Sequence, residues 1–187
     1  MNARFDVLAT PIAGLQVLQR KPIGDDRGYL ERLFCMDELQ ALLPGKRIEQ
    51  INHTLTSGRG TVRGLHFQHP PHAETKFVHC LRGEVFDVAV DLRRGSPTFL
   101  RWHAEVLSAA NHRTFVIPEG FAHGFQALAD DCEMLYFHTA AWSADCEGGL
   151  RHDDPMLAIR WPLSAAAISD RDRHHPLLDA GFSGIPT

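Results

Sequence analysis

The sequence predicts an all-β fold, a sandwich or a barrel, with residues 1–187 forming one domain. Turn signals recur along the chain and separate short runs rich in Val, Phe, Leu and Ile. Several of these runs alternate two kinds of side chain, which is the period-2 pattern of strands. A chain of 187 residues with 44% hydrophobic and 22% charged residues has the size and composition of one globular domain.

The charge balance and the thiols narrow the possible partners and the compartment. Nineteen basic against 23 acidic residues give a net charge of −4, so neither nucleic acid nor an anionic membrane is expected as a main partner. The first residues include Asp6 and lack a long apolar stretch, and no apolar run approaches the roughly 20 residues of a membrane span. We therefore expect a cytoplasmic protein with reduced cysteines at Cys35, Cys80, Cys132 and Cys146.

The pattern favours helices in two places. Residues Asp37 to Leu43 form a helical candidate that Pro44 and Gly45 end. The tail from Trp161 onward, which contains three consecutive alanines at 165–167, is expected to add short helices.

The first informative strand candidate covers residues 63–68. Gly64, His66 and Gln68 share one of its faces, while Arg63 falls on the other by strict alternation. If Arg63 and His66 line one site, the chain must bulge or twist near Gly64, a residue type suited to such a distortion.

Two further strand candidates carry ionisable groups on one face. Between residues 84 and 91, Asp87 and Asp91 share a face with small apolar residues and oppose a bulkier apolar face. Between residues 134 and 138, Tyr136 and His138 share a face with Met134. For one strand alone, solvent and a ligand-binding lumen explain the polar face equally well. Three such strands favour a polar pocket.

One stretch of the sequence matches part of a metal-binding motif. The stretch from Pro118 to His123 has the PxGxxH form of the second cupin motif. Cupins are double-stranded β-helix barrels that often bind a metal through His and Glu. The HxH of the first motif is lacking, because the nearby histidines are His66, His69 and His72. The sequence therefore predicts no metal site, since a metal needs several converging ligands.

Many ordered blocks resemble the nucleotide-sugar 3,5-epimerases, the family typified by dTDP-4-dehydrorhamnose 3,5-epimerase. They extend from about Gly24 to Leu178. The blocks are Asp26–Gly28 with Glu31, Gln50–Asn52, Gly60–Gln68, Lys76–Val78, Gly83 through Asp87 to Arg93, Gly95–Pro97, Pro118–Phe125, Tyr136, Asp153–Pro155, Ile159–Pro162 and Ser169–Asp172. This resemblance implies an all-β, cupin-like jelly-roll (double-stranded β-helix) barrel with short peripheral helices. It also implies an epimerase that uses neither a metal nor another cofactor.

The resemblance implies a role for each matching residue. His66 corresponds to the base, Asp172 to its carboxylate partner, and Tyr136 to the proton donor on the opposite face. Lys76 is suited to neutralising an enolate. The remaining matches would hold the substrate: Arg27, Glu31, Gln50, Asn52, Arg63, Asp87, His123 and Trp142.

The expected substrate is a thymidine-diphosphate 4-keto-6-deoxyhexose, inverted at C3 and C5 for deoxysugar synthesis. The expected assembly is a homodimer, in which the segment of Arg27 and Glu31 reaches the neighbouring subunit's nucleotide site. This chain departs from the family at Trp142, where a second tyrosine is frequent, and at Thr54 and Thr56, which replace a serine pair.

Three alternatives stay open at this point. The first is an epimerase that inverts C3 alone, the second a metal-dependent cupin oxygenase, and the third a non-catalytic cupin that binds sugar nucleotides.

Overall fold

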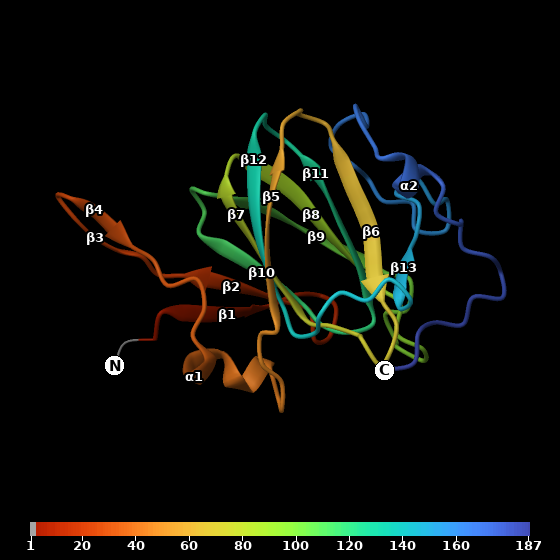
Figure 1. Cartoon of the computed structure of the whole chain (residues 1–187), viewed down its shortest axis with the longest axis horizontal. Coiled ribbons are helices and arrows are strands. Elements are labelled where there is room, and N and C mark those ends of the chain that lie inside the picture. Colours follow the sequence, from red (N-terminus) through yellow and green to blue (C-terminus); the bar gives the residue numbers. More distant parts are fainter. Residues whose placement is uncertain (1–2) are drawn as a thin grey trace.

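Two β-sheets face each other in the computed structural model, which describes residues 3–187 (Figure 1). The first sheet has the strand order β1 (Phe5–Ala9), β2 (Gln16–Arg20), β10 (Arg113–Ile117), β7 (Lys76–Arg82), β12 (Cys132–His138) and β5 (Gln50–Thr56). The second has the order β13 (Glu147–Gly149), β6 (Val62–Gln68), β11 (Phe121–Ala127), β8 (Glu84–Asp91) and β9 (Trp102–Ser108). The strands pair antiparallel. The expected all-β jelly roll is confirmed.

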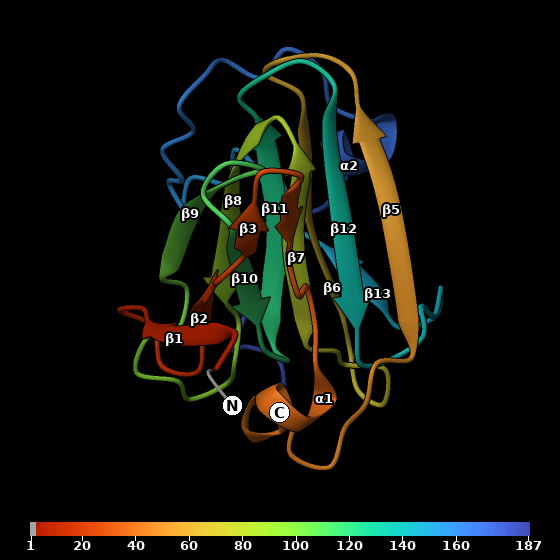
Figure 2. The same ribbon diagram turned by 90° about the vertical axis from the view of Figure 1, so that its left-hand side faces the viewer.

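Three apolar clusters stabilise this arrangement. Together they cover both faces of the central strands. The inner cluster lies between the sheets and includes Val78 and Phe115 of the first sheet with Ala89 and Phe125 of the second. A second cluster covers the outer face of the second sheet, where the C-terminal tail packs on Leu65, Phe67, Val88 and Val90. A third joins the outer face of the first sheet to the segment around the first helix. Figure 2 shows the first sheet in front of the second, with much of the C-terminal segment behind them.

The alternation expected for residues 84–91 is present, with an added detail. Val88 and Val90 point outward beneath the tail, while Val85 and Ala89 point into the inner cluster. Asp87 also lies on the inner face, where it contacts His123 across the sheet. Asp91, in contrast, is held by the following loop through Arg93, Ser96 and Thr98. Asp87 therefore faces the interior between the sheets, whereas Asp91 is held by loop contacts at the end of the strand.

The distortion expected near Gly64 is present where β6 pairs with β11. The pairing register shifts between His123 and Phe125, opposite residues 63–66. A Cβ on Gly64 would lie 2.6 Å from Cα of Gly124, and the φ of Gly64 is +118°. Only glycine tolerates both conditions, so this position lets the two backbones approach and the strand change its twist.

The helices are shorter than the sequence suggests. Helix α1 covers Met36–Leu39 and continues as a 3₁₀ turn, η1 (Gln40–Leu42), before Pro44. The tail from Trp161 onward is expected to add short helices, but the alanines at 165–167 lie outside any helix and have no regular secondary structure. Val62 donates a backbone hydrogen bond to Ala167 and Ala166 donates one to Gly60, so the segment lies along the start of β6. The tail does form one helix, α2 (Asp170–Arg173).

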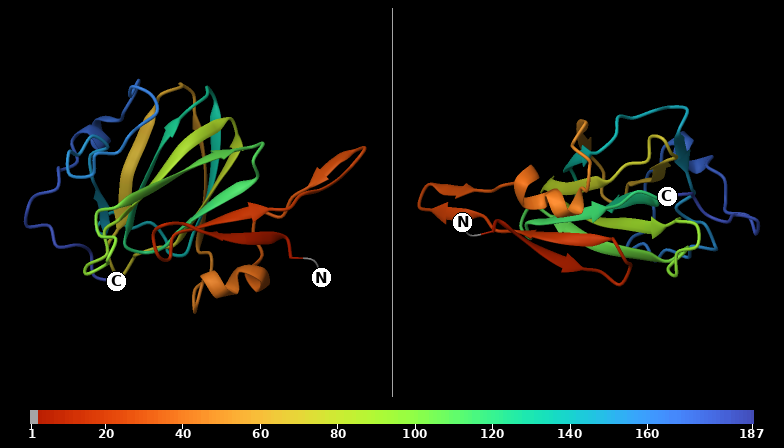
Figure 3. Two further views of the ribbon diagram at one scale, coloured as in Figure 1. Left: turned by 180° about the vertical axis from the view of Figure 1, so that it is seen from behind. Right: turned by 90° about the horizontal axis from the view of Figure 1, so that it is seen from below.

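A two-stranded hairpin, β3 (Ile23–Asp25) and β4 (Gly28–Leu30), projects away from both sheets (Figures 1 and 3). Its apolar side chains are exposed, with 64% of Tyr29 and 65% of Leu30 accessible. Two strands alone are marginally stable in water. Across residues 3–187, no helix has the length and apolar character needed to cross a bilayer.

Candidate active site

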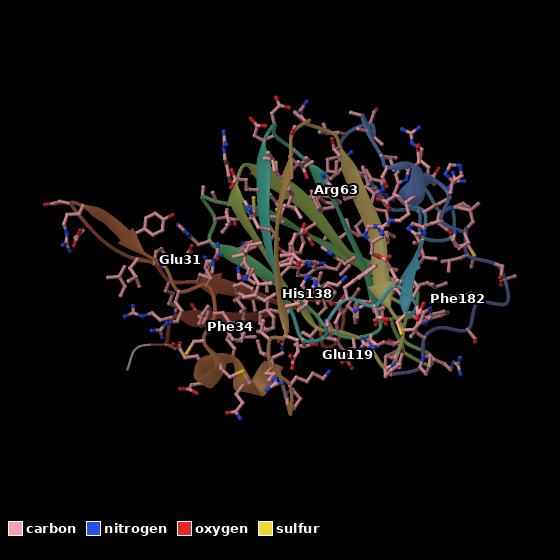
Figure 4. All side chains as sticks on the ribbon, viewed as in Figure 1. Glu31, Phe34, Arg63, Glu119, His138 and Phe182 are labelled. Atoms are coloured by element: carbon pink, nitrogen blue, oxygen red, sulfur yellow. The ribbon has the colours of Figure 1, made fainter. Side chains whose placement is uncertain are left out.

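A cavity of about 720 Å³ opens between the facing edges of the two sheets. Strands β5, β6, β7, β11 and β12 contribute to its wall, and the segment before α2 closes one side. Eight side chains with polar groups from the predicted strands and the tail meet there: Asn52, Arg63, His66, Lys76, His123, Tyr136, His138 and Asp172. Figure 4 labels Arg63 and His138, which come from the two opposing sheets.

His66 and Asp172 form a hydrogen-bonded pair at this wall. The distance between Nε2 of His66 and Oδ1 of Asp172 is 2.8 Å, and the other carboxylate oxygen, Oδ2, accepts a 3.0 Å bond from the backbone N–H of Gly64. Both oxygens are thus fixed. If Nε2 donates to Asp172, the lone pair of Nδ1 remains available as a base.

Helix α2 places Asp172. Ser169 is the N-cap of this helix, and its side-chain oxygen accepts the backbone N–H of Asp172. The Asp172 side chain is 4% exposed. Burial by itself would raise the pKa of Asp172, but the hydrogen bonds from His66 and Gly64 outweigh burial and lower it. The carboxylate therefore stays ionised at neutral pH beside the ring of His66.

Tyr136 lies on β12 with its side chain turned into the cavity. It is 9% exposed, and its ring lies 6.2 Å from the ring of His123 and 6.1 Å from that of His138. Burial raises the pKa of Tyr136 above its usual value of 10. The phenol therefore keeps its proton at neutral pH, as a proton donor requires.

Lys76, at the start of β7, forms a small ionic group with two residues that the sequence analysis left out of the site. Its Nζ lies 3.3 Å from Oε1 of Glu74, and Oε2 of Glu74 lies 2.7 Å from Nδ1 of His138. Burial would raise the pKa of Glu74, but His138 and Lys76 outweigh it, and the pKa is lowered. An ionised Glu74 orients the ammonium of Lys76 at the cavity wall.

His123 and Asp87 form a second histidine–carboxylate pair. Nε2 of His123 lies 2.8 Å from Oδ1 of Asp87 on the neighbouring strand β8. Asp87 is fully buried behind His123 and is not part of the cavity wall. Burial raises the pKa of Asp87, although His123 and Lys76 oppose the shift. Asp87 thus orients His123, and only His123 is placed to contact a ligand.

Four predicted binding residues surround the mouth of the cavity. Arg63 donates from Nε to the hydroxyl of Thr56, which holds its guanidinium against β5. Gln50 donates to Asn52 and accepts the backbone N–H of Trp142. Asn52 and Arg63 line the cavity, while the Trp142 ring is 58% exposed beside it.

Two predicted binding residues, Arg27 and Glu31, lie away from this cavity. Arg27 pairs with Asp25 at the tip of the projecting hairpin. Glu31 stands at the base of the hairpin (Figure 4), where Arg20 and His112 contact its carboxylate. Neither residue reaches the cavity of its own chain.

Sequence reasoning missed Glu74, His138 and Arg171 as site residues. His138 had a usable signal, because strand alternation places it on the face of Tyr136. Glu74 gave no such signal, because it lies outside the strand candidates. Arg171 contacts both His66 and Glu147, and nothing in a charged tail segment indicates that contact.

Comparison with known proteins gives one consistent result. A family model described as dTDP-4-dehydrorhamnose 3,5-epimerase matches residues 9–180. The chain is 44% identical over 170 residues to the dTDP-4-dehydrorhamnose 3,5-epimerase of Pseudomonas aeruginosa, covering 88% of this chain and 92% of that protein. It is 42% identical over 176 residues to the enzyme of Salmonella typhimurium, covering 92% and 95%.

A solved structure agrees with the sequence matches. The crystal structure of dTDP-6-deoxy-D-glucose-3,5-epimerase from Legionella pneumophila, in complex with dTDP-4-keto-L-rhamnose, superposes with a TM-score of 0.90. The two chains are 37% identical, and the match covers 97% of each. These likenesses extend over most of the chain, including every strand that lines the cavity. The chain belongs to the dTDP-4-dehydrorhamnose 3,5-epimerase family.

Proposed function

We propose that this chain inverts C3 and C5 of a dTDP-4-keto-6-deoxyhexose, with His66 as the base and Tyr136 as the proton donor. The observation that carries this proposal is one cavity that holds a carboxylate-paired imidazole, a buried phenol and a lysine ammonium. Proton removal beside a ketone needs these three functions.

The first step is deprotonation. Nδ1 of His66 takes the proton from C3, the electron pair of the C–H bond forms a C3=C4 double bond, and the C4 oxygen becomes an enolate. The ketone of the substrate accepts the electrons, so the step requires no redox cofactor. Asp172 stabilises the resulting imidazolium, and Lys76 neutralises the enolate, an effect worth a few kcal/mol in comparable oxyanion sites.

The second step returns a proton to the opposite face. Tyr136 donates its phenolic proton to C3, and the enolate electrons form the new C–H bond and restore the ketone. Tyr136 is then a phenolate and His66 an imidazolium. Because burial disfavours the phenolate, as the raised pKa of Tyr136 indicates, reprotonation of Tyr136 is favourable. Both groups must exchange protons with solvent before the same pair acts at C5.

The remaining cavity residues are proposed to bind the substrate. Arg63 is suited to a diphosphate, because its planar fork can donate two parallel hydrogen bonds. Asn52 and His123 can hold sugar hydroxyls, supported by Gln50 and Asp87. The exposed ring of Trp142 offers a stacking surface for the nucleotide base.

We further propose a homodimer in which the projecting hairpin completes the partner's site. Its apolar residues are exposed although a lone hairpin is unstable in water. The outward face of edge strand β5 also exposes Ile51 and Leu55. Arg27 at the hairpin tip would then contact the nucleotide bound to the other subunit.

Complementation tests this arrangement. Each of the single variants His66→Ala and Arg27→Ala is expected to have low activity. In a mixed dimer, one site combines an intact His66 with an intact hairpin from the other subunit. Random mixing makes half of the dimers mixed, so activity should recover to about a quarter of wild type. No recovery in mixed dimers verified by mass would contradict hairpin exchange.

We propose a cytoplasmic location because the cysteines are unpaired. All four cysteines are free, and Cys80 and Cys132 are buried among apolar residues. Unpaired cysteines are the usual state in a reducing compartment.

Proton NMR in D₂O tests the reaction. The purified protein is incubated with the dTDP-4-keto-6-deoxyhexose, and exchange at C3 and C5 is followed together with the stereoisomers formed. Exchange and inversion at both carbons are expected. Exchange at C3 alone would assign a C3 epimerase, and nucleotide binding without exchange would assign a binding protein. Activity lost to a chelator together with stoichiometric iron would favour a metal-dependent cupin.

A further inference from the structure

We propose that His66, Asp172 and His175 form an inhibitory site for a divalent transition metal, at the Nε2 edge of the His66 ring. The inhibitory part of this proposal rests on the proposed role of His66 as the base. The site differs from the cupin metal motif, because His123 takes no part in it.

The three donor atoms have the spacing that a metal requires. Oδ1 of Asp172 lies 2.8 Å from Nε2 of His66 and 3.7 Å from Nε2 of His175, and the donor atoms of all three residues lie within 4.8 Å of one another. Zinc bonds of about 2.0–2.1 Å place tetrahedral ligands about 3.3 Å apart, which the two measured separations bracket. Two imidazoles and one carboxylate favour zinc, copper or nickel over magnesium and calcium.

Gly149 links His175 to His66, because it pairs with His66 and the His175 ring lies against it. Gly149 of β13 pairs with His66 of β6, and a Cβ on Gly149 would lie only 2.3 Å from the His175 ring. The glycine thus leaves the space that the imidazole fills. The two histidine rings lie 5.7 Å apart in an edge-to-face arrangement.

His175 also has an unused ligand atom. Within the described residues 3–187, its buried Nε2 has no hydrogen-bond partner. A buried polar atom without a partner is costly and calls for an explanation. A metal ion held with Asp172 and His66 would satisfy this nitrogen.

Arg171 competes with such an ion. Its Nη2 lies 3.0 Å from Nε2 of His66, its Nε lies 3.5 Å from Oδ1 of Asp172, and Glu147 holds the guanidinium from the other side. The positive charge of Arg171 opposes a divalent cation at this point. The side chain is 55% exposed, so it can move into solvent when a metal binds.

Coordination at Nε2 explains why the metal would inhibit. A neutral imidazole that gives the Nε2 lone pair to a metal carries its proton on Nδ1. Nδ1 then has no lone pair for the substrate proton. Because the metal binds the Nε2 edge, opposite the base nitrogen, and His175 is not part of the cavity wall, the substrate can still enter the cavity, and kcat falls while KM changes little.

Zinc titration of the purified protein tests the proposal. In the turnover assay, Zn²⁺ is expected to lower kcat at least about 10-fold at saturation, reversibly with EDTA. His175→Asn should weaken the inhibition at least about 10-fold, because it removes a ligand. Arg171→Gln should strengthen it at least about 3-fold. His174→Asn is the matched control, since the exposed neighbouring ring bonds the Asp170 carbonyl and should leave the inhibition unchanged.

A direct measurement separates this proposal from the proposed reaction. Co²⁺ is added to each variant, the visible absorption of the bound ion is recorded, and circular dichroism verifies folding. A 1:1 signal in wild type and His174→Asn that is lost in His175→Asn would establish the site even if the protein turned over no ketosugar. Equal Co²⁺ binding or equal zinc inhibition in folded His175→Asn and wild type would overturn the proposal, as would zinc inhibition that acts on KM alone.

Discussion

Nε2 of His66 lies 2.8 Å from Oδ1 of Asp172, although 106 positions separate the two residues in the chain. The second oxygen of Asp172 accepts the backbone N–H of Gly64, two residues before His66. One carboxylate therefore fixes both the imidazole and the strand that carries it. This arrangement makes Asp172 a positioning residue whose removal changes the proton transfer more than the binding of nucleotide.

Replacement of either member of this pair should stop the chemistry and spare binding. His66→Ala is expected to abolish exchange of the C3 proton with D₂O. Asp172→Asn should lower kcat by about 10²–10⁴-fold, because the amide neither stabilises the imidazolium nor fixes the same tautomer. NMR exchange and calorimetric dTDP affinity are the measurements. Wild-type exchange in His66→Ala would remove His66 as the base.

Tyr136→Phe should separate deprotonation from reprotonation. The variant retains the ring packing with His123 and His138 but loses the donor proton. Exchange at C3 is expected to persist, while the inverted product falls by about 10²–10⁴-fold. The same NMR spectra report both quantities. Because burial raises the pKa of Tyr136, the basic side of the wild-type pH profile should not reflect this phenol below pH 10. An unchanged product yield would mean that another group is the donor.

Gly64→Ala should destabilise the protein through the close approach of β6 and β11. The new Cβ would lie 2.6 Å from Cα of Gly124, and overpacking of this kind costs about 1–3 kcal/mol in addition to about 1 kcal/mol for the positive φ. Gly95→Ala is the control, since Gly95 has a φ of +74° and a Cβ added there would meet no atom within 4 Å. Urea unfolding should show a clearly larger loss for Gly64→Ala; equal losses would mean that the close approach is unimportant.

Asp91 should contribute to acid sensitivity. Burial alone would raise its pKa, but hydrogen bonds from Arg93, Ser96 and Thr98 outweigh burial and lower the pKa from 3.8 to about 2. A carboxyl with a lowered folded-state pKa stabilises the fold fully above pH 3.8 and loses that effect as the pH falls to 2. The shift corresponds to about 2 kcal/mol.

Asp91→Asn should therefore lower the free energy of unfolding by about 2 kcal/mol at pH 7. The curves of the variant and wild type should approach each other between pH 3.8 and 2. Denaturant unfolding across this pH range measures the difference. A constant difference at every pH would show that the charge of Asp91 makes no contribution.

Local patterns in the amino-acid sequence were enough to predict the strands and the chemistry that they carry. Alternation placed Tyr136 with His138 on one face, and the glycine at 64 indicated the distortion that allows Arg63 and His66 to line one cavity. These features are readable because strand side chains alternate with a period of two, a property of the local backbone.

The way in which distant segments complete the site depends on the folded chain. The fold placed Asp172 behind His66, Glu74 between Lys76 and His138, and His175 in the space above Gly149. It also kept the alanines at 165–167 out of a helix, because Val62 and Gly60 provide backbone hydrogen bonds that outweigh the helical preference of alanine. Most of these contacts depend on packing between segments far apart in the chain, with 106 positions between His66 and Asp172 and 64 between Glu74 and His138, which no local pattern of side chains encodes.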